Sequence, residues 1–182
     1  ARLDGRQITH AARSDIKRLQ VGEGAGFQGT DAGQPRVVLQ GEDCQAGRQQ
    51  GQGGPPSPVP EMFGTSTLGP RTRAILINSP HNPSGMVWRH EDMLKLQEIL
   101  APTSIVLISD EVYEHMVYDG QEHQSAARFP GLAARAFIVS SFGKTYHVTG
   151  WKVGFVAAPA TLTAEFRKVH QFNVFTVNTP VQ

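Results

Sequence analysis

From residue 67 onward, short apolar runs alternate with stretches whose apolar residues recur at helical spacing. Three continuous apolar runs, at residues 74–77, 105–108 and 136–139, predict strands buried on both faces of a parallel sheet. Residues 154–158 form a fourth run of this kind. Residues 91–100 predict a helix, because their apolar side chains fall on or near one face and two acidic residues occupy the first turn.

A second helix is predicted from about Leu162, with Phe166 and Val169 on its buried face. Strands that alternate with helices are typical of an α/β fold, in which helices cover both faces of a mostly parallel sheet. We therefore expect residues 67–182 to form such a sheet with helices packed on its two faces.

Residues 1–66 lack this organisation. Residues 1–60 hold eleven of the nineteen glycines in the chain, and Phe27 is the only Phe, Tyr or Trp in this segment. Such a segment cannot bury enough surface to offset the entropy of ordering the chain, so we expect most of it to be disordered or loosely attached. A reading-frame error upstream of about residue 66 would give the same composition. Residues 37–39 are compatible with an isolated strand, and residues 16–19 with a helical turn.

The overall charge and the cysteine content narrow the functional classes. A formal net charge of +1 gives no bulk attraction to nucleic acid or to an anionic membrane. Cys44 is the only cysteine, so an intrachain disulfide is impossible and a reducing compartment is expected. No apolar run approaches the roughly 20 residues that span a bilayer, and no signal peptide is evident. We therefore expect a cytoplasmic protein without nucleic-acid or membrane partners.

Polar side chains follow three successive predicted strands, at the point where each strand ends. Asn82 follows the first strand, Asp110 the second, and the segment from Ser141 to Lys144 the third. Ligands of α/β sheets bind beyond the carboxyl ends of the strands, so this convergence is the main indication of a site. Pyridoxal phosphate needs an amine for its aldehyde and an anion for its pyridine nitrogen, and Lys144 and Asp110 supply these groups.

Donors for the remaining atoms of this cofactor occur nearby in the sequence. Asn82 and Tyr113 can donate hydrogen bonds to the 3-oxygen, which tunes the Schiff base formed with the lysine. Ser141 and Lys152 offer a hydroxyl group and an ammonium group to the phosphate.

Two other kinds of site are compatible with parts of the pattern. Residues 141–145 resemble the end of a nucleotide-binding P-loop, but that loop needs a glycine where this chain has Ile138. Asp110 and Glu111, with Glu114 and His115, suggest a metal site, yet an exposed acidic first turn of a helix explains them better, because no second pair of ligands stands out. We therefore expect no metal ion.

Three ordered blocks carry a resemblance to a known family: residues 78–85 (NSPHNPSG), 109–114 (SDEVYE) and 140–154 (SSFGKTYHVTGWKVG). Together they resemble the fold-type I pyridoxal-phosphate-dependent aminotransferases of class I/II. The Gly-Lys-Thr context and the TGWKVG string are most similar to the methionine and kynurenine aminotransferase branch. The resemblance covers about residues 67–182 and implies an incomplete large domain of that fold, preceded by the irregular segment 1–66.

The resemblance also implies roles for individual residues. Lys144 corresponds to the lysine that forms the Schiff base and moves the proton during the reaction. The other cofactor-binding positions that it implies are Asp110 for the pyridine nitrogen, Asn82 and Tyr113 for the 3-oxygen, and Ser141 and Lys152 for the phosphate. Lys152 stands where many members have arginine, so a single ammonium group replaces a guanidinium that can bind phosphate through two N–H groups at once.

The activity that the resemblance implies is transamination, with a homodimer when the chain is full length. The amino group of methionine or of an aromatic or other bulky uncharged amino acid would pass to a 2-oxo acid. Two alternatives stay open: a carbon–sulfur β-lyase on the same cofactor, which would release ammonia and pyruvate, and a catalytically inactive fragment or pseudoenzyme. Residues 1–66 show neither a phosphate-binding turn nor a ring to stack on the cofactor, and Gln182 precedes the expected small domain. We therefore expect the 182-residue chain as written not to transaminate.

Overall fold

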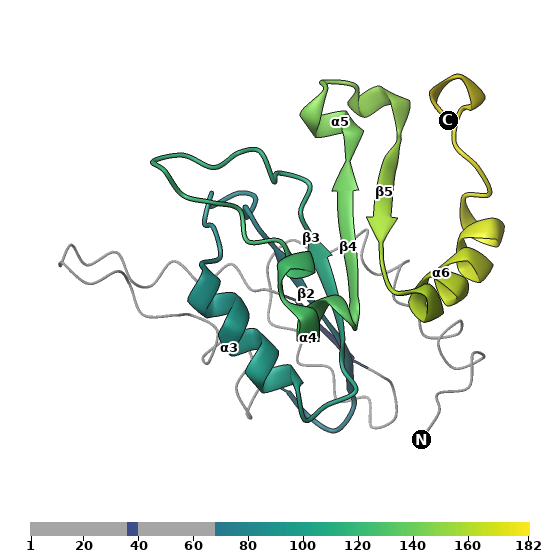
Figure 1. The fold of residues 1–182 in the computed structure, drawn as a ribbon. Helices are drawn as coiled ribbons and strands as arrows, with labels where there is room; N and C mark the ends of the chain where they lie inside the picture. The colour runs from purple at the N-terminus through teal and green to yellow at the C-terminus, as the bar shows by residue number, and fades with distance from the viewer. Residues whose placement is uncertain (1–35, 40–67) are drawn as a thin grey trace.

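The computed structural model describes residues 36–39 and 68–182, and it organises them around one five-stranded sheet (Figure 1). The strands are β1 (Arg36–Leu39), β2 (Thr72–Asn78), β3 (Val106–Asp110), β4 (Ala136–Ser141) and β5 (Gly154–Ala157). They lie side by side in sequence order; β1 to β4 run parallel, and β5 runs antiparallel to β4. The expected mostly parallel sheet is therefore confirmed.

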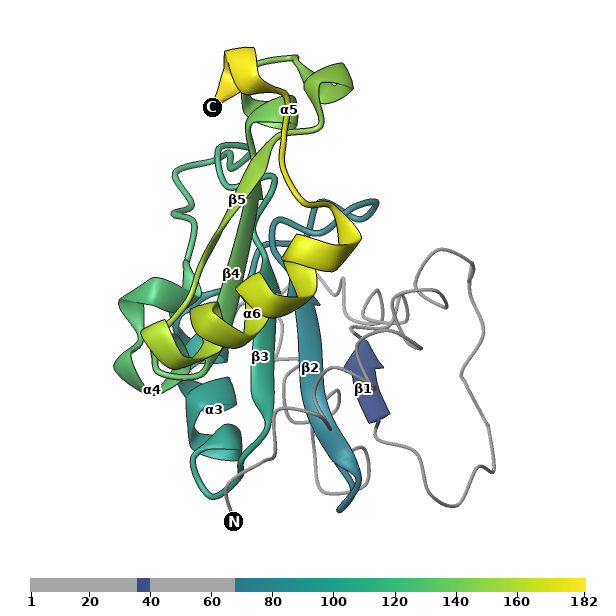
Figure 2. The same ribbon diagram turned by 90° about the vertical axis from the view of Figure 1, so that its right-hand side faces the viewer.

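Helices cover both faces of this sheet, as expected (Figures 1 and 2). The helical elements are α3 (His90–Leu100), η2 (Ala126–Arg128), α4 (Pro130–Ala133), α5 (Phe142–Thr145), η3 (Thr149–Trp151), α6 (Ala160–Asn173) and η4 (Thr179–Val181). Helices α3 and α4 lie against one face, whereas α6 crosses the other face near β4 and β5.

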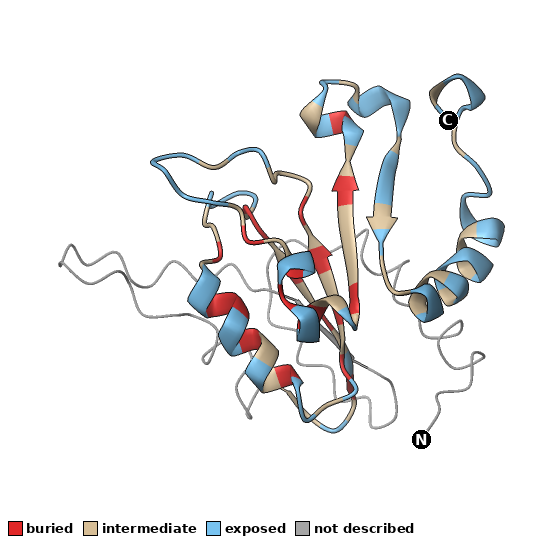
Figure 3. Cartoon of the chain, viewed as in Figure 1, coloured by how far each residue is buried: buried red, intermediate tan, exposed pale blue. Residues whose placement is uncertain are grey.

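The hydrophobic core lies between the sheet and helices α3 and α4. Ile75, Ile77 and Leu107 point into it and are completely buried, because alternate side chains of a strand face the same side of the sheet. Helix α3 contributes Met93 and Leu96, which are also buried, while its outer side is exposed to solvent (Figure 3). This hydrophobic core holds β2, β3 and β4, the strands that carry the candidate site, in place.

Two polar contacts hold the ends of α3 in place. At its first turn, the backbone N–H of Arg89 donates a 2.9 Å hydrogen bond to the Asp92 carboxylate, half of a capping box. Beyond its last turn, one guanidinium nitrogen of Arg135 lies 2.8 Å from the carbonyl oxygens of both Leu100 and Thr103. Arg135 directly precedes β4, so this contact joins the end of α3 to the start of that strand.

Helix α6 is less covered than the sequence predicts. Its Phe166 ring lies 6.1 Å from the ring of Phe137 on β4, but Phe166 is 37% exposed and no residue of the helix is buried. The expectation that Phe166 and Val169 are buried is therefore wrong. The helix crosses the sheet obliquely, so it meets β4 through this aromatic contact while most of its surface faces away from the strands (Figure 2).

The N-terminal part of the chain is described only at β1, which pairs in parallel with β2. This pairing confirms the strand expected at residues 37–39. The helical turn expected at 16–19 and the disorder or frame error expected within residues 1–66 otherwise fall outside the described residues. No helix in the described part of the chain is both long and apolar enough to cross a membrane.

The core predicts a large effect of one substitution on stability. Leu107→Ala removes a completely buried side chain from the middle of β3, and we expect it to lower the free energy of unfolding by about 2–5 kcal/mol. Leu94→Ala on the outer side of α3 is the matched control, because Leu94 is 41% exposed and its loss should cost below about 1 kcal/mol. Urea denaturation measures both values, and equal losses would contradict this location of the core.

Candidate active site

The carboxyl ends of β2, β3 and β4 meet at one edge of the sheet. Asn78 at the end of β2 pairs in register with Asp110 at the end of β3, and Asp110 pairs with Val139 on β4. β4 continues to Ser141, where α5 begins and carries Lys144. The parallel register therefore gathers the ends of three strands and the connections that follow them, as the sequence predicts.

Asn78 ties the connection after β2 to the end of β3. Its side-chain oxygen accepts a 2.8 Å hydrogen bond from the backbone N–H of Asn82, and its side-chain nitrogen donates a 3.0 Å bond to the Asp110 carbonyl. The backbone N–H of Ser79 donates to the same carbonyl at 3.1 Å. No separate role was predicted for Asn78, although it opens the first of the three blocks.

Three of the predicted side chains approach one another at this edge. The Asn82 side-chain nitrogen donates to the Tyr113 hydroxyl oxygen across 3.4 Å. The Lys144 ammonium nitrogen lies 5.9 Å from the centroid of the Tyr113 ring. An amide, a phenol and an amine from the ends of three different strands thus face a common space around Tyr113.

The Asp110 carboxylate lies beside this group and makes few hydrogen bonds to the described residues. Among the described residues, its side chain accepts one hydrogen bond, at 3.2 Å from the backbone N–H of Val112. Burial raises the pKa of the Asp110 carboxyl above its usual range; the Val112 bond opposes this rise, and the nearby charge of Glu111 adds to it. A cationic ring nitrogen placed here would supply a counter-charge that none of the described residues provides.

The two predicted phosphate ligands differ in their surroundings. Ser141 caps α5, with its hydroxyl oxygen accepting a 3.1 Å hydrogen bond from the backbone N–H of Gly143. Gly143 is packed so closely that an added Cβ would lie 2.9 Å from the backbone of Thr149, so this turn must stay compact. Lys152 ends η3 in a left-handed conformation and is exposed, and no hydrogen bond or ion pair joins its ammonium group to another described residue.

Glu111 departs most from the sequence expectation. Residues 111–114 form turns and no helix, and Glu111 is only 2% exposed, so the expected exposed acidic helical turn is wrong. Burial disfavours its charge, but hydrogen bonds from His123, the Ala126 backbone and neighbouring hydroxyls outweigh this and leave the pKa of Glu111 below its usual range. One signal was available, because strand alternation puts Glu111 on the buried side of β3 together with Ser109.

The carboxylates of Glu111 and Glu114 converge with His123, and the three groups offer ligand atoms within 4.8 Å of one another. His115, which the sequence places with them, is instead 69% exposed in its side chain and lies 3.7 Å from Glu114. Protein donors already occupy both oxygens of Glu111, from Ser109 and Ala126 on one side and His123 on the other. The cluster is therefore an internal hydrogen-bonded network.

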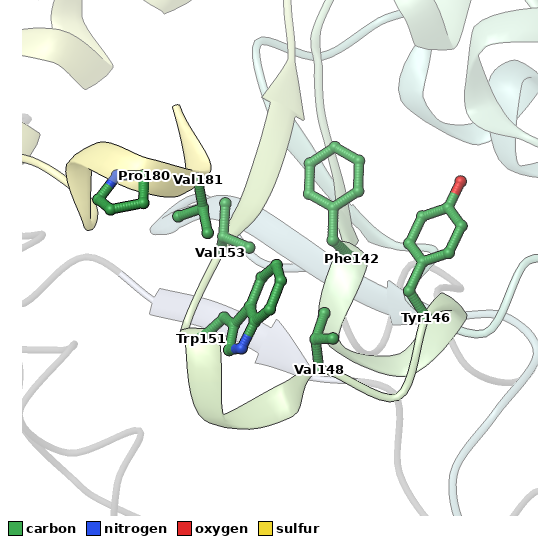
Figure 4. Close-up of a pocket in the computed structure, with 7 residues that line it drawn as sticks. All are labelled: Phe142, Tyr146, Val148, Trp151, Val153, Pro180 and Val181. Atoms are coloured by element: carbon green, nitrogen blue, oxygen red, sulfur yellow. The ribbon is translucent and has the colours of Figure 1, made fainter.

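A separate hollow lies beyond α5 (Figure 4). Its lining is formed by Phe142, Tyr146, Val148, Trp151, Val153, Pro180 and Val181. These side chains are apolar apart from the Tyr146 hydroxyl and the Trp151 indole N–H, and none of the predicted cofactor-binding residues is among them. The hollow lacks an amine and an anion, so the strand edge is the candidate active site.

Comparison with known proteins identifies the family. The family model described as aminotransferase class I and II matches residues 59–182. This chain belongs to that family. A methionine aminotransferase of Escherichia coli is 54% identical over 115 residues, which are 63% of this chain and 30% of the relative. A kynurenine–oxoglutarate transaminase of Dictyostelium discoideum is 40% identical over 114 residues, or 62% of this chain and 26% of the relative.

Solved structures agree with this aminotransferase assignment. The Escherichia coli structure for which a methionine aminotransferase function was identified aligns with a TM-score of 0.62 at 53% identity, and covers 63% of this chain and 30% of that one. An N-succinyldiaminopimelate aminotransferase of Mycobacterium tuberculosis aligns with a TM-score of 0.59 at 42% identity, with coverage of 62% and 29%. The chain therefore spans about 30% of the length of the relatives that it matches.

Class I and II aminotransferases use pyridoxal phosphate, and the donor set at the strand edge fits this group. Asp110 is an under-coordinated, partly buried carboxylate suited to a protonated pyridine nitrogen. Lys144 is an exposed primary amine, and among the described residues no carboxylate forms an ion pair with it. Asn82 and Tyr113 offer polar hydrogens on the same side.

The raised pKa of Asp110 predicts a dependence of stability on pH in the cofactor-free protein. A carboxyl whose folded pKa is raised stabilises the fold below its unfolded pKa, and this contribution is lost as the pH rises through the folded pKa. Asp110→Asn keeps the acceptor for Val112 but cannot ionise. We expect this variant to have a higher urea midpoint than the parent near neutral pH, and the two midpoints to converge in acid. A difference in urea midpoint that stays constant at all pH values would contradict the burial of the Asp110 carboxyl.

Proposed function

We propose that this chain forms the cofactor-binding part of a pyridoxal-phosphate-dependent aminotransferase. The enzyme would transfer the amino group of methionine, or of an aromatic or other bulky uncharged amino acid, to a 2-oxo acid. The observation that carries the proposal is the approach of Asn82, Tyr113 and Lys144 beside Asp110 at one sheet edge, in a chain of this family.

The proposed roles follow from the chemistry of each side chain. Lys144 holds the cofactor covalently through its amine, and Asp110 keeps the pyridine nitrogen protonated through its negative charge. Asn82 and Tyr113 donate to the 3-oxygen, while Ser141 and Lys152 hold the phosphate. Pyridoxal phosphate, when bound, supplies an electron sink for the pair of electrons left when the substrate Cα–H bond breaks.

Lys144 also acts as the base and acid of the reaction. When its amine is free, Lys144 Nζ would accept the proton from the substrate Cα and return it to the carbon on the other side of the transferred nitrogen. The short helix α5 keeps this amine beside Tyr113, with Ser141 capping the first turn.

The proposed substrate class rests on the similar proteins. The relative at 54% identity is a methionine aminotransferase, and several at about 40% are kynurenine–oxoglutarate transaminases. Methionine and kynurenine are bulky amino acids without a carboxylate in the side chain, in line with the branch that residues 140–154 resemble. A homodimer in the cytoplasm is part of the same proposal.

Replacement of Lys144 tests the proposal. In a version of the protein that spans the full length of its relatives, Lys144→Ala should abolish the visible absorption band of the bound cofactor and lower transamination of methionine by at least about 1,000-fold, because attachment and proton transfer both depend on this amine. Absorption spectroscopy and an oxo-acid assay measure these effects.

Lys168→Ala is the matched control, since Lys168 lies on α6 in an exposed ion pair with Glu165 at 2.7 Å. This control should keep both the absorption band and the activity of the parent. Unchanged transamination by Lys144→Ala would sink the assignment.

A further inference from the structure

The turn at residues 111–114 is attached to the rest of the protein at both of its ends. At the first end, the Glu111 carboxylate accepts hydrogen bonds from the Ser109 hydroxyl at 2.8 Å and the Ala126 backbone N–H at 2.9 Å. His123 Nε2 lies 2.9 Å from its other oxygen. Charge-assisted hydrogen bonds of a buried carboxylate are about twice as strong as neutral ones, so this end is firmly fixed.

Glu114 fixes the second end of the turn. Its carboxylate accepts a 2.9 Å hydrogen bond from the Ser140 hydroxyl on β4, directly before the cap of α5. The backbone N–H of Glu114 donates a 2.9 Å bond to the carbonyl of Glu111, which closes the turn. The two carboxylates thus join one short turn to three places: the end of β3, the segment 123–126, and β4.

Tyr113 lies between these two attachments, and the polar contacts of its side chain to described residues are long. Its hydroxyl is 3.4 Å from the Asn82 side chain, near the upper limit for a hydrogen bond, and its ring is 5.9 Å from the Lys144 ammonium nitrogen. The position of the phenol at the strand edge therefore depends on the backbone of the turn, which Glu111 and Glu114 hold.

We propose that Glu111 and Glu114 are positioning residues that hold Tyr113 where its hydroxyl can donate to the 3-oxygen of pyridoxal phosphate. This inference rests on the proposed function. It assigns a task to two carboxylates that are not among the predicted cofactor-binding residues, and it explains why the buried Glu111 lies directly behind the site.

The hydrogen bonds that hold the turn end on two carboxylates. Ser109, Ala126 and His123 contact the Glu111 carboxylate, and Ser140 donates to Glu114. A glutamine replaces these charge-assisted hydrogen bonds with weaker neutral ones. Glu111→Gln should therefore loosen the first end, and Glu114→Gln the second, without changing side-chain volume. The other charged or titratable groups near the turn are Asp110, His115 and Lys144. The charge of Glu111 helps to raise the pKa of Asp110, so Glu111→Gln also lowers that pKa, and Glu114→Gln is the cleaner variant for a titration.

The first test follows the absorption band of bound pyridoxal phosphate as the pH is varied, in the full-length protein. Tyr113→Phe removes the phenol and should move the midpoint of this titration. Glu114→Gln should move it in the same direction by a smaller amount. In a Tyr113→Phe background, Glu114→Gln should not move it further, because it acts through the phenol. Glu111→Gln is kept for the second test, since loss of its charge also changes the pKa of Asp110.

Glu98→Gln is the matched control for the loss of a carboxylate. Glu98 lies on the exposed side of α3 in an ion pair with Lys95, away from the strand edge, so the midpoint should not move. A shift of equal size in this control, or a shift by Glu114→Gln that persists in the Tyr113→Phe background, would overturn the positioning role.

The second test needs no cofactor. Amide hydrogen exchange in the cofactor-free protein should become about tenfold faster in Glu111→Gln for the N–H groups of Glu114, Met116 and Ala126, while α3 keeps the parent rates. Unchanged local rates, or an equal rise in α3, would show that Glu111 does not act on the turn. Glu114→Gln provides the same readout if Glu111→Gln folds poorly, because the Glu114 side chain is 28% exposed.

The proposed function and the positioning role are overturned by different results. If unmutated protein does not attach pyridoxal phosphate to Lys144, the proposed function is overturned, and the positioning role with it. If attachment is normal and Glu114→Gln titrates as the parent does, only the positioning role is overturned.

Discussion

The parallel register of β2, β3 and β4 is the constraint on which the rest of the structure depends. Parallel strands end at the same edge, so Asn78, Asp110 and the start of α5 come together although more than 60 residues separate the first from the last. The complete burial of Ile77 and Leu107 beneath α3 fixes that register, because a slip of one residue would turn these side chains out of the core.

The two faces of the sheet divide the work between stability and chemistry. The face under α3 and α4 holds the hydrophobic core, and the buried Glu111 with its hydrogen-bond donors lies on the same side. The other face and the edge above it are more open, and there Asp110 keeps a carboxylate with few partners. The ionised Asp110 carboxylate destabilises the fold when it has no cationic partner, and it can bind a cationic ligand for the same reason. Perturbed pKa values of this kind are typical of functional sites.

Much of this arrangement could be predicted from the sequence, since continuous apolar runs mark buried strands and the polar residues after them mark the edge. The approach of Asn82 to Tyr113 followed from the same rule, and three motif blocks indicated the family that the comparisons then showed. The buried network of Glu111 could not be predicted, because His123 reaches it only through the packing of a later segment. The exposure of Phe166 was missed because periodicity shows which face of a helix is apolar, and not what covers it.

The attachment point of pyridoxal phosphate tests the central claim most directly. Borohydride reduction of the protein incubated with the cofactor, followed by proteolysis and mass spectrometry, locates the modified lysine. A single major adduct on the peptide that contains Lys144 is the predicted result. An adduct spread over exposed lysines such as Lys95 and Lys168, or one concentrated on Lys152, would contradict the account.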